Sequence, residues 1–173
     1  MRLSVLIIKL LYSYSNINFA GLWAVVNNAG ISLPGVIEWQ TVEEMRKVVD
    51  VNIWGVVAIT KAFLPLLKTT KGRVVNIASC LGRVAVPGGA AYCISKFGVQ
   101  AFSDALRLEM RHFGVTVHII EPGFFKTNIT DTKRIVQHME TLWENLDADT
   151  KQSYGIEYFE KGKKYILIFI SFL

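Results

Sequence analysis

The segment that decides the fold is residues 79–96, Ser-Cys-Leu-Gly-Arg-Val-Ala-Val-Pro-Gly-Gly-Ala-Ala-Tyr-Cys-Ile-Ser-Lys. Tyr92 and Lys96 lie four residues apart in a stretch that predicts a helix, so their side chains share one face. Ser79 follows an apolar, β-branched run, residues 73–78, that predicts a buried strand. Because an open α/β sheet binds its ligand where strands end and helices begin, we expect a functional site here.

The three polar side chains of this segment predict proton transfer at an alcohol. A phenol has a pKa of about 10, and lowering it to about 7 requires about 4 kcal/mol. One ammonium about 4 Å away in a partly desolvated site supplies that much, so we expect Lys96 to lower the pKa of Tyr92. Ser79 would hydrogen-bond the oxygen whose charge changes while hydride leaves or joins the carbon. The alternative for the Tyr-x-x-x-Lys pair alone is an exposed cation beside an aromatic ring.

Length and composition indicate one globular domain. The chain has 173 residues, of which 51% are hydrophobic, enough to form a core. The net charge of +5 is moderate and scattered, without basic residues interleaved with aromatic ones, so we expect no nucleic-acid partner. Lys161, Lys163 and Lys164 form one tight basic group, which is either a solvated tail or a contact with an anionic membrane surface.

The cysteines and histidines predict no metal site. Cys80 and Cys93 lack metal-ligand spacing and are typical of small buried residues in a reducing compartment. His112, His118 and His138 form no cluster in the sequence.

The pattern along the chain predicts alternating strands and helices. Apolar runs at 22–26, 73–78 and 115–121 predict strands, and helices are expected from Thr41 toward Leu67 and over 90–113. Thr41 and Glu44 form a capping-box signature, and Gly114 is a natural helix stop. Short connections between these elements favour a parallel sheet with right-handed crossovers.

Both ends and one polar position are harder to interpret. Residues 1–12 are apolar but are interrupted by Lys9; they are shorter than the about 20 residues that span a bilayer, and they make a poor signal peptide. Residues 133–146 predict an amphipathic helix, whereas 147–164 are polar with aromatic residues. Asn52 interrupts an apolar helix, either as a surface residue or as a side chain or local kink directed at a site.

Together, these residues resemble the short-chain dehydrogenase/reductase family over about residues 22–160. The resemblance implies an α/β fold, here a partial doubly wound parallel, Rossmann-like sheet with three core strands and flanking helices. The matching features, in the family's order and spacing, are Asn27-Asn28-Ala29-Gly30, Asn52 within Asp-Val-Asn-Ile-Trp-Gly, Ser79 thirteen residues before Tyr92, Tyr92-x-x-x-Lys96, and Pro122-Gly123 followed by Thr127.

The resemblance implies an oxidoreductase that interconverts an alcohol and its carbonyl with NAD or NADP. Tyr92 would be the acid/base, and Lys96 would lower its pKa and hold the nicotinamide ribose. Ser79 would bind the substrate oxygen, and Asn52 would position a water that relays the proton. The other residues implied to bind cofactor are Asn28, Ala29 and Gly30 on the adenosine side, and Pro122, Gly123 and Thr127 on the nicotinamide side.

Finer detail resembles the retinol and hydroxysteroid dehydrogenase branch. The residues involved are the run 121–127 and Leu142-Trp143-Glu144 followed by Ser153-Tyr154-Gly155. This branch implies a lipophilic primary or secondary alcohol, retinol- or steroid-like, with NAD favoured. It also implies a homodimer and association with the endoplasmic-reticulum membrane; without the resemblance, a cytoplasmic protein is expected.

The sequence departs from the family at both ends. Only Gly21 precedes Gly30, so the glycine-rich loop that cradles the pyrophosphate is not found. We therefore divide the chain into a non-matching segment 1–20, a truncated domain 21–160 and a non-matching tail 161–173. The alternative function is a catalytically inactive fragment or partner subunit that associates through its long helices. We expect weak NAD or NADP binding and poor solubility, because strand 22–26 would be an unpaired sheet edge.

Overall fold

The computed structural model describes residues 21–171, with side chains as far as residue 165. Its centre is a parallel three-stranded sheet in the order β1 (Ala24–Asn27), β2 (Arg73–Ile77) and β3 (Thr116–Ile120). Val25 lies opposite Val74, and Val74 lies opposite Val117. The predicted α/β parallel sheet is confirmed, with strand bounds shifted by one or two residues. The expectations for residues 1–20 lie outside the described residues.

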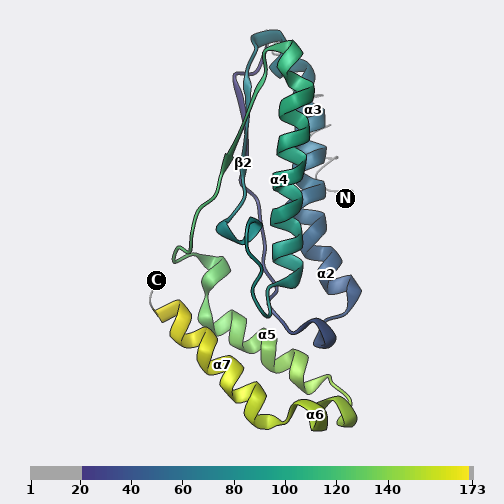
Figure 1. Cartoon of the computed structure of the whole chain (residues 1–173), viewed down its shortest axis with the longest axis vertical. Coiled ribbons are helices and arrows are strands. Elements are labelled where there is room, and N and C mark those ends of the chain that lie inside the picture. Colours follow the sequence, from purple (N-terminus) through teal and green to yellow (C-terminus); the bar gives the residue numbers. More distant parts are fainter. Residues whose placement is uncertain (1–20, 172–173) are drawn as a thin grey trace, which may run out of the picture.

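Two helical crossovers cover one face of this sheet (Figure 1). The first consists of α2 (Val42–Val49), the π-helical turn η2 (Asp50–Trp54) and α3 (Gly55–Thr70). The second consists of α4 (Ala90–Met110) and the 3-10 turn η4 (Arg111–Phe113). The side chains that fill the interface are aliphatic, and they come from the sheet and from both long helices: Val25, Leu67, Val74, Leu106, Met110 and Val117.

Local sequence sets the ends of these helices. Thr41 accepts a hydrogen bond from the backbone of Glu44, whose carboxylate accepts one from the backbone of Thr41, so the predicted capping box is confirmed. Gly114 ends the α4 extension with a φ of 70°, which a residue without a Cβ adopts freely. The sequence thus predicted these boundaries from capping residues alone.

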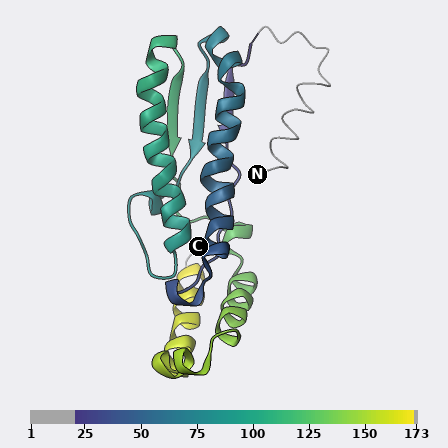
Figure 2. The same cartoon turned by 90° about the vertical axis from the view of Figure 1, so that its right-hand side faces the viewer.

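The opposite face of the sheet is exposed within the described part of the chain. Trp23 and Val26 are 66% and 59% exposed, and Ile120 is 50% exposed. Figure 2 shows α3 and α4 together on one side of the strands, and Figure 1 shows no described helix on the other. β1 is an edge strand of the described sheet, as the sequence predicted for its first strand.

A second group of helices lies beyond the carboxyl ends of the strands (Figure 1). It comprises the 3-10 turn η5 (Asn128–Thr130), α5 (Thr132–Glu144), α6 (Ala148–Tyr154) and α7 (Ile156–Ser171). Trp39, from the 3-10 turn η1 (Ile37–Trp39), is buried among the aromatic rings of this group. Those rings are Trp143, Tyr154, Tyr158 and Phe159, with centroids 5.2–6.3 Å from that of Trp39. The sequence predicted α5 but not α6 or α7.

Within residues 21–171, one continuous helical stretch, Val42–Thr70, is long and apolar enough to cross a membrane. Its second half, α3, packs against β1 and β2. A core helix of a soluble domain meets the same criteria, so this stretch does not indicate a membrane span by itself.

Candidate active site

Asn52 is fully buried and joins the loop after β1 to α4. Its Oδ1 accepts a hydrogen bond from the Ile31 backbone at 2.8 Å, and its Nδ2 donates to the Ile31 carbonyl at 2.9 Å and to Ser95 Oγ at 3.0 Å. Asn52 lies in the π-helical turn η2, a feature frequent at functional sites. The helix is therefore locally irregular at Asn52, and the alternative that Asn52 is a surface residue is excluded. Because protein atoms use both amide hydrogens, a relay water would have to use the remaining lone pair of Oδ1.

Gly30 marks the point where three elements converge. A Cβ added at Gly30 would lie 3.5 Å from Asn52 Oδ1 and 3.7 Å from Lys96 Nζ. Lys96 itself is 4% exposed, and its Nζ donates to the Ile77 carbonyl at 2.8 Å. Burial lowers the pKa of Lys96 to about 8. The Asn-Ala-Gly turn, η2 and α4 thus bring an amide and an ammonium together beside one glycine.

Ser79 and Tyr92 form the second half of the site. Ser79 is buried directly after β2, where its Oγ accepts a hydrogen bond from the Leu81 backbone at 3.1 Å. Tyr92, from the first turn of α4, lies close enough to Ser79 for the serine hydroxyl to lower the pKa of its phenol. The structure therefore brings together the four predicted catalytic residues, Asn52, Ser79, Tyr92 and Lys96.

The expected effect of Lys96 on Tyr92 is wrong in this structure. Burial raises the pKa of the Tyr92 phenol, and the Ser79 hydroxyl offsets only part of that rise. Lys96 Nζ lies 5.5 Å from the centre of the Tyr92 ring and is hydrogen-bonded to the strand carbonyl of Ile77. The ammonium is thus directed at the sheet, and burial determines the pKa of the phenol.

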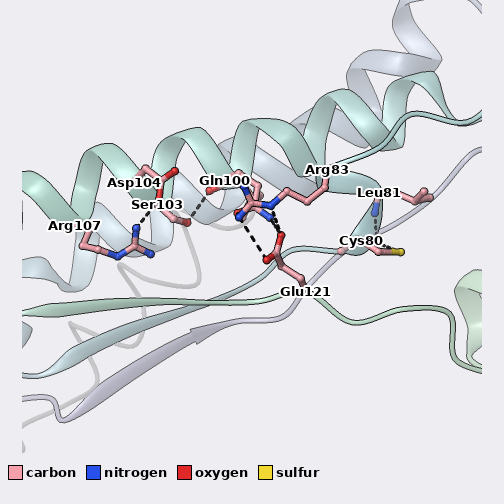
Figure 3. Close-up of polar contacts among 10 residues, drawn as sticks. Cys80, Leu81, Arg83, Gln100, Ser103, Asp104, Arg107 and Glu121 are labelled. Carbon is pink, nitrogen blue, oxygen red and sulfur yellow. Dashed lines mark hydrogen bonds and ion pairs between the residues drawn. The ribbon is translucent and has the colours of Figure 1, made fainter.

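The loops after β2 and β3 are joined by a polar clamp that the sequence did not predict (Figure 3). Arg83 Nε donates to Glu121 Oε1 at 2.6 Å, and Gln100 hydrogen-bonds the same carboxylate. The Arg83 guanidinium lowers the pKa of Glu121, and Glu121 raises that of Arg83. The Cys80 backbone also donates to the Pro122 carbonyl at 3.0 Å. The clamp fixes Ser79 relative to the loop at Pro122. Arg83 and Glu121 are 38 residues apart, so no local pattern in the sequence predicts their contact.

Gly82 allows this loop to approach α4. A Cβ at Gly82 would lie 2.9 Å from the carbonyl oxygen of Lys96, closer than real Cβ atoms come to backbone. Any larger residue would move the loop that carries Ser79 away from the helix that carries Tyr92.

A chain of buried polar groups holds the strands and helices in register behind the site. Asn27 Nδ2 donates to Asn76 Oδ1 at 2.8 Å and to Thr60 Oγ1 at 3.0 Å. Asn76 Nδ2 then donates to Ser103 Oγ at 2.8 Å. These bonds link β1 and β2 to α3 and α4. The signal that we missed in the sequence is Asn76 itself, a polar residue inside the apolar run Val-Val-Asn-Ile.

The residues predicted to bind cofactor lie at the carboxyl ends of the outer strands. Asn28 and Ala29 are exposed next to Gly30 after β1, and Gly123 and Thr127 are exposed beyond β3, with Pro122 half-buried. They flank Ser79, which follows the central strand. A Cβ at Gly123 would meet nothing within 4 Å, so this side of the site is open. The open side at Pro122, Gly123 and Thr127 has room for the nicotinamide side of a dinucleotide, but the sequence contains no Gly-x-Gly-x-x-Gly motif for the pyrophosphate.

In the part of the chain that the structure describes, no group of three His, Cys, Asp or Glu side chains is arranged to hold a metal ion. Cys80 is half-buried and Cys93 is buried, and both are free thiols.

Comparison with known families identifies the fold. The family model described as short chain dehydrogenase matches residues 8–138. The chain belongs to the short chain dehydrogenase family. A solved short chain dehydrogenase from Burkholderia cenocepacia J2315, in complex with NADP, superposes with a TM-score of 0.66 and 26% identity, covering 74% of this chain and 54% of that one.

Over the aligned part of the chain, about half of the positions are identical in several curated relatives. Short-chain dehydrogenase/reductase family 9C member 7 of Bos taurus is 55% identical, covering 80% of this chain and 44% of the relative. Retinol dehydrogenase 7 of Rattus norvegicus is 52% identical, with 78% and 43% covered. Mitochondrial D-beta-hydroxybutyrate dehydrogenase of Rattus norvegicus is 48% identical, with 82% and 42% covered. The chain thus spans less than half the length of these relatives.

Proposed function

We propose that this chain carries the acid/base site of an oxidoreductase that interconverts an alcohol and its carbonyl with a nicotinamide cofactor. The observation that carries the proposal is the convergence of Gly30, Asn52 and Lys96 beside the Tyr92 ring, whose phenol Ser79 influences. We further propose NAD as the cofactor and a lipophilic, retinol- or steroid-like primary or secondary alcohol as the substrate. The names of the relatives support an alcohol substrate without selecting its class, since they include a retinol and a hydroxybutyrate dehydrogenase.

The residues divide the work of the reaction between them. Tyr92 would take the alcohol proton in oxidation and return it in reduction, and Ser79 Oγ would hydrogen-bond the substrate oxygen. Lys96 and Tyr92 would hold the nicotinamide ribose, the Asn28–Gly30 turn would line the adenosine side, and Pro122, Gly123 and Thr127 the nicotinamide side. The bound nicotinamide would supply or accept the hydride. Because burial raises the pKa of Tyr92, the phenol is protonated at neutral pH and is suited there to donate its proton to a carbonyl.

A second function is favoured by one observation. The sheet face with Trp23, Val26 and Ile120, and the outer residues Ile94 and Leu108 of α4, are exposed apolar surface. A fragment or partner subunit without catalysis would bury such surface against another chain. This surface does not distinguish between three further predictions. They are homodimerisation through α3 and α4, contact with a membrane surface, and location at the endoplasmic reticulum.

Titration of the 173-residue chain with NADH separates the two functions. Isothermal titration calorimetry is combined with sedimentation velocity and with an assay for alcohol-dependent NADH formation at millimolar NAD. NADH binding together with turnover supports the oxidoreductase. Stable self-association without NADH binding or turnover supports the inactive subunit and contradicts the oxidoreductase.

A further inference from the structure

A pocket of about 440 Å³ lies between the loop that follows β1 and helix α5. On one side it is lined by residues 30–34 and on the other by η5 and α5. Gly30, at one end of the lining, is the residue whose added Cβ would contact Asn52 Oδ1 and Lys96 Nζ. The pocket therefore begins at the candidate active site and extends toward the helical part of the chain.

The walls of this pocket combine apolar and polar side chains. The apolar residues include Ile31, Leu33 and Ile135, and the polar ones include Arg134 and His138. None of the lining residues is acidic, and Arg134 is a permanent cation. A ligand that fills the pocket thus meets an apolar surface and one positive charge.

Arg134 has no carboxylate partner among the side chains that the structure describes. The six salt bridges found there use other cations, namely Arg46, Arg83, Arg107, Lys161 and Lys163. The acidic group that acts on neighbouring His138 is Glu44, whose carboxylate is already engaged with Thr41 in the capping box. The charge of Arg134 is therefore available to a ligand.

Arg134 is an exposed residue at the edge of the pocket, so its guanidinium keeps its donors free for a ligand. A carboxylate there would accept two charge-assisted hydrogen bonds from the guanidinium, whereas a neutral ligand accepts only weaker ones. Arginine is the side chain best suited to such bidentate binding, because its planar donors match the two carboxylate oxygens. The physical balance thus favours an anionic ligand over a neutral one of the same shape.

We propose that the pocket between residues 30–34 and α5 binds a hydroxy acid, with its carboxylate on Arg134 and its apolar body against Ile31, Leu33 and Ile135. The proposal rests on the proposed function in taking the ligand as an alcohol, and it narrows the lipophilic substrate to one with an acidic end. Among the lipophilic alcohols that the proposed function admits, the neutral ones are expected to bind more weakly than those with a carboxylate.

The test compares an acid with its neutral ester on the 173-residue chain. Calorimetric titration uses beta-hydroxyoctanoate and its methyl ester, against wild type, Arg134→Gln and the matched control Lys133→Gln on the adjacent, exposed position outside the pocket. Wild type is expected to bind the acid about tenfold more tightly than the ester. Arg134→Gln is expected to remove that preference without weakening ester binding, while Lys133→Gln retains it.

Three results would overturn the proposal. The first is no measurable binding of the acid to wild type, and the second is equal affinity of wild type for acid and ester. The third is an equal loss of the preference for the acid in Arg134→Gln and Lys133→Gln. The first two need no variant, so a folding defect in Arg134→Gln leaves the comparison intact. Failure of the proposed function looks different: a chain without alcohol turnover still shows the Arg134-dependent acid preference. A chain that oxidises neutral alcohols without any acid preference retains the proposed function and loses this proposal.

Discussion

The α/β part and the helical part of the molecule have cores of different kinds. Behind the site, valines and leucines surround a chain of hydrogen bonds that runs from Asn27 through Asn76 to Ser103. The helical part is held by aromatic rings around Trp39, whose buried Nε1 has no hydrogen-bond partner among the residues that the structure describes. Hydrogen bonds fix side chains in direction, whereas aromatic burial supplies stability with less directional constraint. The core behind the site is thus partly polar and hydrogen-bonded, whereas the core of the helical part is mainly aromatic.

The largest effect is expected for Trp39→Ala. Removing a buried tryptophan costs about 3–5 kcal/mol, and here the loss falls on the contacts with α5, α6 and α7. Hydrogen exchange should show lost protection in α5 and α7 while β2 stays protected. Equal loss in β2 would mean that the two parts have one common core, and the comparison would fail.

A loss of comparable size, but spread over the α/β part, is expected for Asn76→Ala. The substitution leaves a hydrogen of Asn27 and the oxygen of Ser103 without a partner, at about 1–3 kcal/mol for each buried group. Urea unfolding should show a reduced free energy of unfolding and loss of protection in β1, β2 and α4 together. Asn145→Ala, at an exposed position, is the control and should change stability little. An Asn76→Ala variant as stable as this control would show that the polar chain does not hold the α/β part.

Lys96 gives an effect on stability that depends on pH. Its pKa is about 8 when folded and 10.5 when unfolded, so the unfolded chain binds more protons between these values. The free energy of unfolding therefore rises with pH between about 8 and 10.5. Below that window Lys96 is charged in both states, and its buried charge destabilises the folded state. The free energy of unfolding of wild type minus that of Lys96→Met should increase with pH across this window. A constant or falling difference would show that Lys96 is not desolvated.

Local signals explain what the sequence predicted and distant contacts explain what it missed. The capping box at Thr41 and the strand over residues 73–77 depend on neighbouring residues, so periodicity and capping chemistry sufficed. Helices α6 and α7 were missed because their aromatic face is buried against Trp39, more than a hundred residues earlier. Residues 147–164 taken alone therefore look polar and irregular.

The candidate site was predicted in its members but not in its electrostatics. Spacing in the sequence was enough to select Ser79, Tyr92 and Lys96, because the end of a strand and the residues on one face of a helix can be predicted from local sequence. The pKa of Tyr92 was predicted in the wrong direction, since it depends on burial and on the Ile77 carbonyl that binds Lys96. The clamp between Arg83 and Glu121 was missed because their contact forms only when β2 and β3 lie side by side.

The measurement that tests the account most directly is alcohol oxidation by Tyr92→Phe at millimolar NAD. Phenylalanine keeps the ring and removes only the titrating hydroxyl, so folding should match wild type, and NADH affinity should fall by no more than the loss of one hydrogen bond to the ribose, about tenfold. Turnover should fall about a thousandfold, while Tyr165→Phe, at an exposed position, should retain it. A Tyr92→Phe variant within about tenfold of wild type would contradict the role of Tyr92 as the acid/base, since general acid–base catalysis contributes more than that.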